Sequence, residues 1–271
     1  MFFSEKQNKG TELRIKAKKI LFRKKSKFQK IEIFESYDWG KVLMLDSLFM
    51  LTERDEFFYH ESLVHPILSS IKNPENVLII GGGDCGTLRE VLKHPVKKVI
   101  QVEIDELVFK ASLKYFPWVK KIYKDKRVSF IFEDAKDFIK NAEDKFDVVI
   151  LDTSDPVGPA KVFYKKEFYE DLKKILKKNG GLAIQAESPI HHLKRIKKLY
   201  EILKDEYKSI LPYLSPMPTY PGGLWLYLFV FNKKIKMLKP VRIPKNTRYY
   251  NKEIHFSGFK IPEFLKRIFG I

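Results

Sequence analysis

The 271-residue sequence contains a single cysteine, Cys85, so it cannot form an internal disulfide. A lone cysteine suits a reducing compartment, and the sequence therefore predicts a cytoplasmic protein. No apolar run reaches the roughly 18 residues that a membrane-spanning helix needs. The first residues, MFFSEKQNKG, also lack the apolar core of an export signal. We expect no membrane association and no export.

Acidic residues are few relative to basic ones: 52 Lys and Arg against 34 Asp and Glu leave a formal net charge of +18. Such an excess is typical of nucleic-acid-binding proteins. Half of it lies in residues 1–30, however, and the rest is scattered in lysine-rich stretches with the spacing of solvated helix faces and turns. Because net charge alone is a weak signal, we expect no nucleic acid as the main partner and keep a nucleic-acid binder as an alternative.

The composition and the apolar periodicity of the sequence change near residue 53. Residues 1–53 consist of short runs rich in β-branched and aromatic residues, separated by turn residues such as Gly40 and Asp46, which predicts a small N-terminal antiparallel β domain. Its expected strands cover residues 12–22, 28–36, 41–46 and 48–51. Thr52 and Asp55 have capping-box spacing, so we expect a helix to start there and to be kinked by Pro66.

Residues 54–271 alternate between apolar strand-like runs and helical stretches. The expected strands cover 77–80, 99–103, 128–132, 148–151, 182–186, 210–214 and 224–231, and the expected helices cover 87–93, 106–115, 136–141, 164–176 and 191–205. Near-continuous apolar strands joined by helices are typical of a parallel sheet covered on both faces. We therefore predict an α/β fold with a doubly wound sheet, preceded by the small β domain.

A glycine-rich loop follows the first of these strands. Gly81, Gly83 and Gly86 match G-x-G-x-x-G, and Glu103 ends the next strand, where it can hold ribose hydroxyls. The motif alone fits a dinucleotide or an adenosyl-sulfur ligand equally well. Asp84 in the same turn would repel a pyrophosphate by about 4 kcal/mol at 4 Å and a dielectric near 20. The loop therefore favours an adenosyl ligand with a cationic group nearby.

Acidic residues also follow two later strands. Asp134 and Ala135 come after one strand, where an acid and a backbone amide can bind adenine. Asp152 and Asp155 come after the next, in a loop that contains no Lys or Arg before Lys161. A turn with aspartate caps would also explain this pair. Because Asp84 lies on a neighbouring loop, we favour a negatively charged pocket for a cationic substrate.

The order of these motifs resembles the polyamine aminopropyltransferases, the family of spermidine synthase. The resemblance rests on GGGD, VEID, EDA, LDTSDPVGPA and PTYPGG, beginning at residues 81, 102, 133, 151 and 218, and it extends to Gln29, 51–61 and 248–255. It implies a methyltransferase-type Rossmann domain over residues 54–271 and a homodimer or homotetramer. The implied reaction moves the aminopropyl group of decarboxylated S-adenosylmethionine, a co-substrate, onto a diamine, with no cofactor and no metal.

The resemblance also implies roles for individual residues. The adenosyl part of the donor would contact Gln29, Gly81, Gly83, Glu103, Asp134, Ala135 and Pro159. Asp84 and Asp155 would bind amino groups, His60 would line the amine channel, and Asp152 with Tyr59 and Tyr220 would surround the attacking nitrogen.

The residues support this chemistry independently. An aliphatic amine has a pKa near that of lysine, about 10.4, so it must lose a proton before it attacks. Asp152 is suited to accept that proton. We expect putrescine as the acceptor; agmatine, cadaverine or spermidine remain alternatives, as does an S-adenosylmethionine-dependent methyltransferase. Three positions depart from the family. Cys85 replaces a small residue, usually glycine, Phe2 replaces a tryptophan near the amine pocket, and Ser47 replaces a turn glycine.

Overall fold

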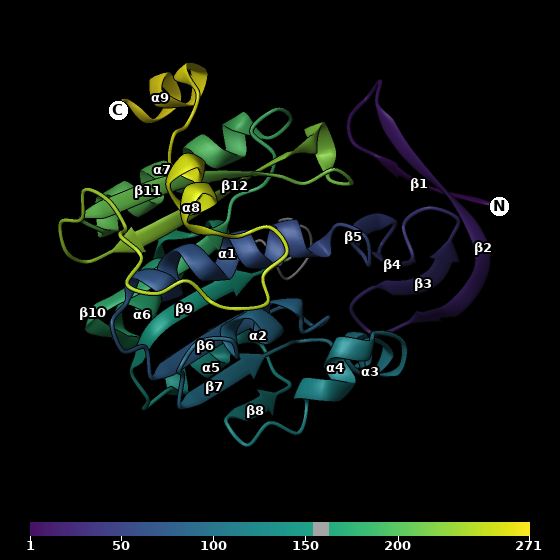
Figure 1. The fold of residues 1–271 in the computed structure, drawn as a ribbon, viewed down its shortest axis with the longest axis horizontal. Coiled ribbons are helices and arrows are strands. Elements are labelled where there is room, and N and C mark those ends of the chain that lie inside the picture. The colour runs from purple at the N-terminus through teal and green to yellow at the C-terminus, as the bar shows by residue number, and fades with distance from the viewer. Residues whose placement is uncertain (154–162) are drawn as a thin grey trace.

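The computed structural model describes residues 1–153 and 163–271, whose strands form two sheets (Figure 1). The smaller sheet is antiparallel, with its strands in chain order: β1 (Phe2–Lys6), β2 (Glu12–Lys25), β3 (Lys30–Ser36), β4 (Lys41–Leu45) and β5 (Leu48–Thr52). β1 adds to the four strands predicted from the sequence. Asp46 and Ser47 join β4 to β5 with φ values of 45° and 68°, which is the left-handed backbone of a two-residue hairpin turn.

The larger sheet has the order β11-β12-β10-β9-β6-β7-β8. Its strands are β6 (Asn76–Gly81), β7 (Lys98–Val102), β8 (Val128–Ile131), β9 (Phe146–Asp152), β10 (Leu176–Gln185), β11 (Ser209–Pro216) and β12 (Leu224–Phe231). Five neighbouring strands of this sheet run parallel: β8, β7, β6, β9 and β10. Strands β12 and β11 are antiparallel additions at one edge. This confirms the predicted doubly wound α/β fold. β6 lies between β7 and β9, so the chain reverses its winding direction at the end of β6, where such sheets bind ligands.

Helices cover both faces of this sheet. They are α1 (Glu56–Ser70), α2 (Gly86–Val91), α3 (Glu106–Tyr115), α4 (Pro117–Ile122), α5 (Ala135–Asn141), α6 (Lys166–Ile175), α7 (Leu193–Glu206), α8 (Lys252–Gly258) and α9 (Glu263–Phe269). Alternate residues of β6 separate two cores: Val77 and Ile79 pack with α1, and Leu78 and Ile80 pack with α5 and α6. None of the helices in these described ranges has the length and apolarity needed to cross a bilayer.

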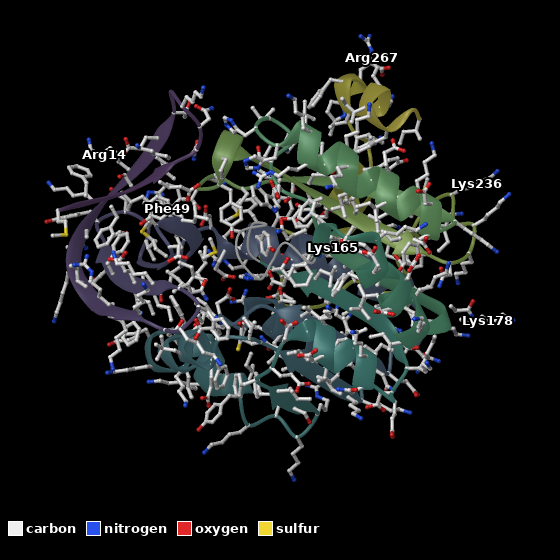
Figure 2. All side chains as sticks on the ribbon, turned by 180° about the vertical axis from the view of Figure 1, so that it is seen from behind. Arg14, Phe49, Lys165, Lys178, Lys236 and Arg267 are labelled. Atoms are coloured by element: carbon white, nitrogen blue, oxygen red, sulfur yellow. The ribbon has the colours of Figure 1, made fainter. Side chains whose placement is uncertain are left out.

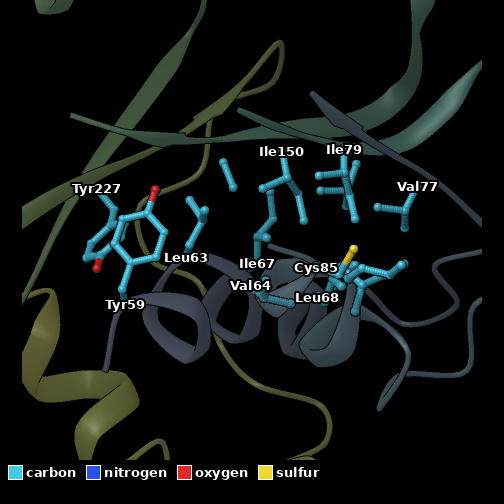
Figure 3. Packing of buried hydrophobic residues seen from close by; sticks show 14 of the residues in the cluster. Tyr59, Leu63, Val64, Ile67, Leu68, Val77, Ile79, Cys85, Ile150 and Tyr227 are labelled. Carbon is cyan, nitrogen blue, oxygen red and sulfur yellow. The ribbon is translucent and has the colours of Figure 1, made fainter. Parts of the chain in front are cut away.

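Helix α1 is buried over most of its length, which distinguishes it from an ordinary surface helix. Figure 3 shows Leu63 and Ile67 of α1 facing Ile79 and Ile150 of the sheet. The helix begins at Glu56 rather than at Thr52, because the Thr52 hydroxyl donates to Asp55 Oδ1 at 2.6 Å and that pair forms the turn before the helix. Pro66 lies within α1, as predicted, since the helix continues to residue 70.

The basic excess lies on the outside of the molecule. Figure 2 shows Arg14 on the small sheet and Lys178, Lys236 and Arg267 on the larger domain projecting from the outer surface. The described site carboxylates Asp84, Glu103 and Asp152, by contrast, are only partly exposed. Surface and site therefore carry opposite charge, as the distribution along the sequence indicates.

Candidate active site

The glycine loop packs tightly against the end of β9. Gly81 has a φ of 83°, and a Cβ atom there would lie 2.2 Å from the carbonyl oxygen of Asp152, so only glycine fits. The next amide, of Gly82, donates to that carbonyl at 2.8 Å. Gln101 of β7 donates from Nε2 to the carbonyls of Gly81 and Gly82 at 3.0 and 2.6 Å. Gln101 was not identified from the sequence, because it lies inside a strand rather than at its end.

Asp152 ends β9 and is held by two hydroxyl groups. Tyr59 of α1 donates to Oδ1 and Thr87 of α2 donates to Oδ2, both at 2.7 Å. Burial and the negative charge of Asp84 raise the pKa of Asp152. Burial and the charge of Asp152 also raise the pKa of Tyr59, so its hydroxyl stays protonated and remains a donor. Thr87 was expected only as a helix residue; its contact with Asp152, 65 positions away, comes from packing.

Asp84 lies between the backbone of α2 and an imidazole from α1. Its Oδ1 accepts the amide of Gly86 at 2.7 Å and lies 3.3 Å from Nε2 of His60. The other ring nitrogen of His60 is 2.7 Å from a carboxylate oxygen of Glu56. Burial lowers the pKa of His60, but the carboxylates of Asp84 and Glu56 outweigh it and raise that pKa to about 10. His60 is therefore an imidazolium that bridges two carboxylates.

This bridge continues into a row of alternating charges. Arg89 donates to both carboxylate oxygens of Glu56, at 3.0 and 2.7 Å, and its Nε donates to Glu90 at 2.7 Å. Glu90 in turn lies 2.9 Å from Nε2 of His65. The charges in helices α1 and α2 gave no signal in the sequence, because they face one another only once the two helices pack together.

The end of β7 carries Glu103, as predicted for a ribose-binding acid. Its Oε1 accepts the amide of Asp105 at 2.8 Å, and burial raises its pKa to about 7. A Cβ atom on Gly83 would lie 3.0 Å from Oε2, so the glycine leaves room beside the carboxylate. Gln29 of the small domain reaches the same place, donating from Nε2 to Asp105 Oδ2 at 3.1 Å. The structure thus brings Gln29, Glu103 and the glycine loop together.

The remaining predicted adenosyl contacts lie at the end of β8. Asp134 caps α5 by accepting the amide of Lys136 at 2.8 Å, and Ala135 is the first residue of that helix. Asp155 and Pro159 lie outside the described residues. The described part of the chain contains no group of three His, Cys, Asp or Glu side chains arranged to hold a metal ion.

Cys85 follows Asp84 with a φ of 59°, which explains why glycine suits this position. The side chain is fully buried in the core beneath the loop, and burial raises the pKa of its thiol. Cys85 is therefore a packed residue, and its side chain points to the hydrophobic cluster shown in Figure 3.

A small cavity of about 50 Å³ lies beside Asp152, between the two sheets. Tyr220 lines it and donates through its hydroxyl to the carbonyl of Met50 in β5. The ring of Tyr220 lies 5.6 Å from that of Tyr59 and 4.6 Å from that of Trp225. The other lining residues are Glu5, Leu48, Phe49, Met50, Thr153, Gln185 and Pro221.

Phe2, which replaces a family tryptophan near the amine pocket, does not line this cavity. Its side chain is 54% exposed and stacks under the guanidinium of Arg14, 5.0 Å from the ring centroid. Successive side chains of a strand point to opposite faces, and in β1 the inward positions are Phe3 and Glu5. In this chain Phe3 and Glu5, rather than Phe2, are therefore the β1 side chains that face inwards.

Comparison with known proteins agrees with this geometry. Residues 56–239 match the model of the spermine/spermidine synthase domain, and residues 1–53 match that of the spermidine synthase tetramerisation domain. The chain belongs to the spermine/spermidine synthase family. Its members are aminopropyltransferases, so the chain is a transferase, as the motif order predicts.

Individual relatives in this family cover nearly the whole chain. The polyamine aminopropyltransferase of Methanocaldococcus jannaschii is 43% identical over 98% of this chain and 94% of its own length. That of a Thermoanaerobacter species is 40% identical over 99% and 98%.

Two crystal structures of spermidine synthase are also similar, each 34% identical to this chain and covering all of it. One, of a complex with the transition state analogue AdoDATO, has a TM-score of 0.94 over 95% of that chain. The other, from Thermotoga maritima, has a TM-score of 0.92 over 94%.

Proposed function

We propose that this chain transfers the aminopropyl group of decarboxylated S-adenosylmethionine to putrescine, giving spermidine and methylthioadenosine. The observation that carries the proposal is the pair of carboxylates, Asp84 and Asp152, at the ends of neighbouring strands around one glycine loop. Both carboxylates attract cationic groups, as a reaction between a cationic donor and a cationic acceptor requires, and the amide of Gly82 donates directly to the carbonyl of Asp152 at the end of its strand. Family membership supports the same reaction class.

The donor would lie along the ends of β6, β7 and β8. Glu103 is placed to accept the ribose hydroxyls beside Gln29, and Asp134 with the amide of Ala135 to contact the adenine. Without a carboxylate, the donor's propyl chain ends in an ammonium group. Asp84 would bind it in exchange for its present partner, the imidazolium of His60.

Asp152 would act as the general base. The acceptor nitrogen forms a bond to the propyl carbon, the carbon–sulfur bond breaks, and its electron pair converts the sulfonium to a neutral thioether. The proton lost from the nitrogen passes to Asp152, whose raised pKa makes it a stronger base than an exposed aspartate. Tyr59 and Thr87 fix the orientation of the carboxylate. Tyr220 would border the acceptor on the cavity side.

The proposal also covers the domain boundary, the oligomeric state, the cellular compartment and two further site residues. We place the domain boundary between residues 53 and 54 and infer a homo-oligomer, a dimer or tetramer, because residues 1–53 match the tetramerisation domain of spermidine synthases. The single cysteine fits a reducing compartment such as the cytoplasm. Asp155 and Pro159, outside the described residues, would complete the amine and adenosyl contacts.

The proposal is tested by incubating the protein with decarboxylated S-adenosylmethionine and, separately, putrescine, cadaverine, agmatine or spermidine, and by measuring methylthioadenosine and product masses. Putrescine is expected to give the highest kcat/KM. A preference for another amine would correct the acceptor, and no methylthioadenosine with any amine would refute aminopropyl transfer. A parallel reaction with S-adenosylmethionine that gave a methylated amine would instead support the methyltransferase alternative.

The role of Asp152 has its own test. Asp152→Asn is expected to lower kcat by roughly a hundredfold to ten-thousandfold, the usual contribution of a general base, with the fold intact by circular dichroism. Asp137→Asn, which makes the same change on the exposed surface of α5, is the matched control and should leave kcat unchanged. Full activity of Asp152→Asn would exclude Asp152 as the base.

A further inference from the structure

Glu56, the first residue of α1, reaches the site through His60. Its Oε2 lies 2.7 Å from Nδ1 of the imidazole ring, while the other ring nitrogen lies 3.3 Å from Asp84 Oδ1. Glu56 and His60 are both buried, so water does little to balance their charges. The imidazolium therefore has two counter-ions, one in the site and one outside it.

The carboxylate of Glu56 is fixed by a guanidinium group. Arg89 of α2 donates to both of its oxygens, at 3.0 and 2.7 Å, which is the bidentate geometry of a strong ion pair. Burial raises the pKa of Glu56, but the hydrogen bonds and charges of His60 and Arg89 outweigh it and lower that pKa. Glu56 is therefore ionised at neutral pH and cannot turn away from His60 without breaking its pair with Arg89.

The imidazole ring has little room to withdraw from Asp84. A Cβ atom on Gly86 would lie 2.2 to 2.4 Å from three ring atoms, so the backbone of α2 is close to the ring, and Tyr59 meets the ring edge-on. The charged side chains around the ring in the described part of the chain are those of Glu56, Asp84, Arg89 and Asp152. A second cation that binds Asp84 would therefore lie close to the imidazolium.

A cationic donor creates a conflict at Asp84. The donor's ammonium group would bind this carboxylate in place of the imidazolium, and two positive charges would then lie side by side. We propose that Glu56 is a positioning residue, which balances the charge of the imidazolium and holds the ring once the ammonium group of the donor occupies Asp84. The inference rests on the proposed function. Without Glu56, the imidazolium would remain on Asp84 and compete with the donor.

The test distinguishes the ammonium group from the rest of the donor. Methylthioadenosine has the adenosyl part but no aminopropyl group, so its binding should not depend on Glu56. In Glu56→Gln, calorimetry at about pH 7.5 should show the Kd of decarboxylated S-adenosylmethionine rising roughly tenfold to hundredfold, while that of methylthioadenosine changes less than about twofold. Glu263→Gln makes the same change at the exposed first residue of α9 and should alter neither Kd.

A pH profile gives a readout that a change in packing alone would not produce. Burial lowers the pKa of His60, and the carboxylates of Asp84 and Glu56 together raise it to about 10, so Glu56→Gln should lower it. The ring should then lose its proton as the pH rises, which removes the competing charge. The Kd of the donor in Glu56→Gln, divided by that in the unmodified enzyme, should therefore decrease towards one between about pH 7 and 9.5. This ratio cancels the titration of Glu103 and of the donor, which both proteins share.

The outcomes separate this inference from the proposed function. An unmodified enzyme that releases no methylthioadenosine with any amine would refute the proposed function. In an active enzyme, the role of Glu56 is overturned if Glu56→Gln weakens both ligands equally, leaves donor binding unchanged, or gives a ratio that does not depend on pH.

A measurement on the unmodified enzyme decides the case if Glu56→Gln does not fold by circular dichroism. Calorimetry in buffers of different ionisation enthalpy counts the protons released on binding. At about pH 8.5, decarboxylated S-adenosylmethionine should release no more protons than methylthioadenosine, because Glu56 retains the imidazolium. The release of about one further proton would show that His60 loses its charge when the donor binds, and would overturn the inference.

Discussion

Replacing Gly86 with alanine would measure how firmly the His60 imidazolium is held. Gly86 is the first residue of α2, and a Cβ atom built on it would lie 2.2 Å from Cε1 of His60 and 2.4 Å from both ring nitrogens. The backbone itself accepts alanine, since Gly86 does not have a positive φ. Either the ring or the start of α2 must therefore move.

The ring cannot move without losing its partners. It lies 2.7 Å from Glu56 and 3.3 Å from Asp84, and it meets the ring of Tyr59 edge-on with centroids 5.2 Å apart. Overpacking a core typically costs about 1–3 kcal/mol, and we take about 3 because three ring atoms are too close. Alanine regains up to about 1 kcal/mol of helix propensity. The free energy of unfolding should fall by about 2 kcal/mol.

Urea denaturation of the single variants Gly86→Ala and His60→Ala and of the double variant tests this value. Without the imidazole the clash is absent, so Gly86→Ala should stabilise the His60→Ala protein by up to about 1 kcal/mol, which gives a coupling energy of about 3 kcal/mol. Gly10→Ala, where a Cβ atom meets nothing within 4 Å, is the control and should change stability by less than about 0.5 kcal/mol. Additive effects, or an unchanged stability of Gly86→Ala, would refute the reasoning.

Two further predictions concern catalysis and donor binding. Tyr59→Phe removes the hydroxyl that donates to Asp152 at 2.7 Å. Its kcat, measured by methylthioadenosine release, should fall about tenfold while the KM for the donor stays unchanged. An unchanged kcat would show that this hydrogen bond does not orient the base. Burial raises the pKa of Glu103 to about 7, and an ionised carboxylate accepts ribose hydroxyls more strongly than a neutral carboxyl group does. The affinity for methylthioadenosine should therefore increase with pH and level off above about pH 7. Calorimetry between about pH 5.5 and 8.5 should show the affinity for methylthioadenosine increasing by up to about tenfold per pH unit below about pH 7. This increase should be absent in Glu103→Gln. A pH-independent affinity in the unmodified enzyme would contradict an ionised Glu103 in the site.

The strand ends were the most predictable part of the site. Apolar runs mark the buried strands, and the carboxyl ends of parallel strands meet at one edge of the sheet. Asp84, Glu103, Asp134 and Asp152 could therefore be placed together from the order of strands and loops alone, and the structure puts each of them at that edge.

Short elements were less predictable. β1, α4, α8 and α9 have between five and seven residues, too few for a repeated apolar spacing to stand out. The sequence did not predict β1, and this had a direct consequence for the site. Without its register, nothing in the sequence distinguishes Phe2, which points to solvent, from Glu5, which lines the cavity.

The fold class and the negative charge of the site follow from the amino-acid sequence, because glycine spacing, apolar periodicity and the placement of acids are local properties of the chain. The hydrogen-bond partners of those acids, by contrast, depend on how the helices and strands pack. Thr87 donates to Asp152, and His60 bridges Glu56 and Asp84. Gln101 donates to the carbonyls of the glycine loop. Each of these contacts joins elements that meet only when the chain packs. The residue type sets the charge of a side chain, but its hydrogen-bond partners depend on which faces of distant elements pack together.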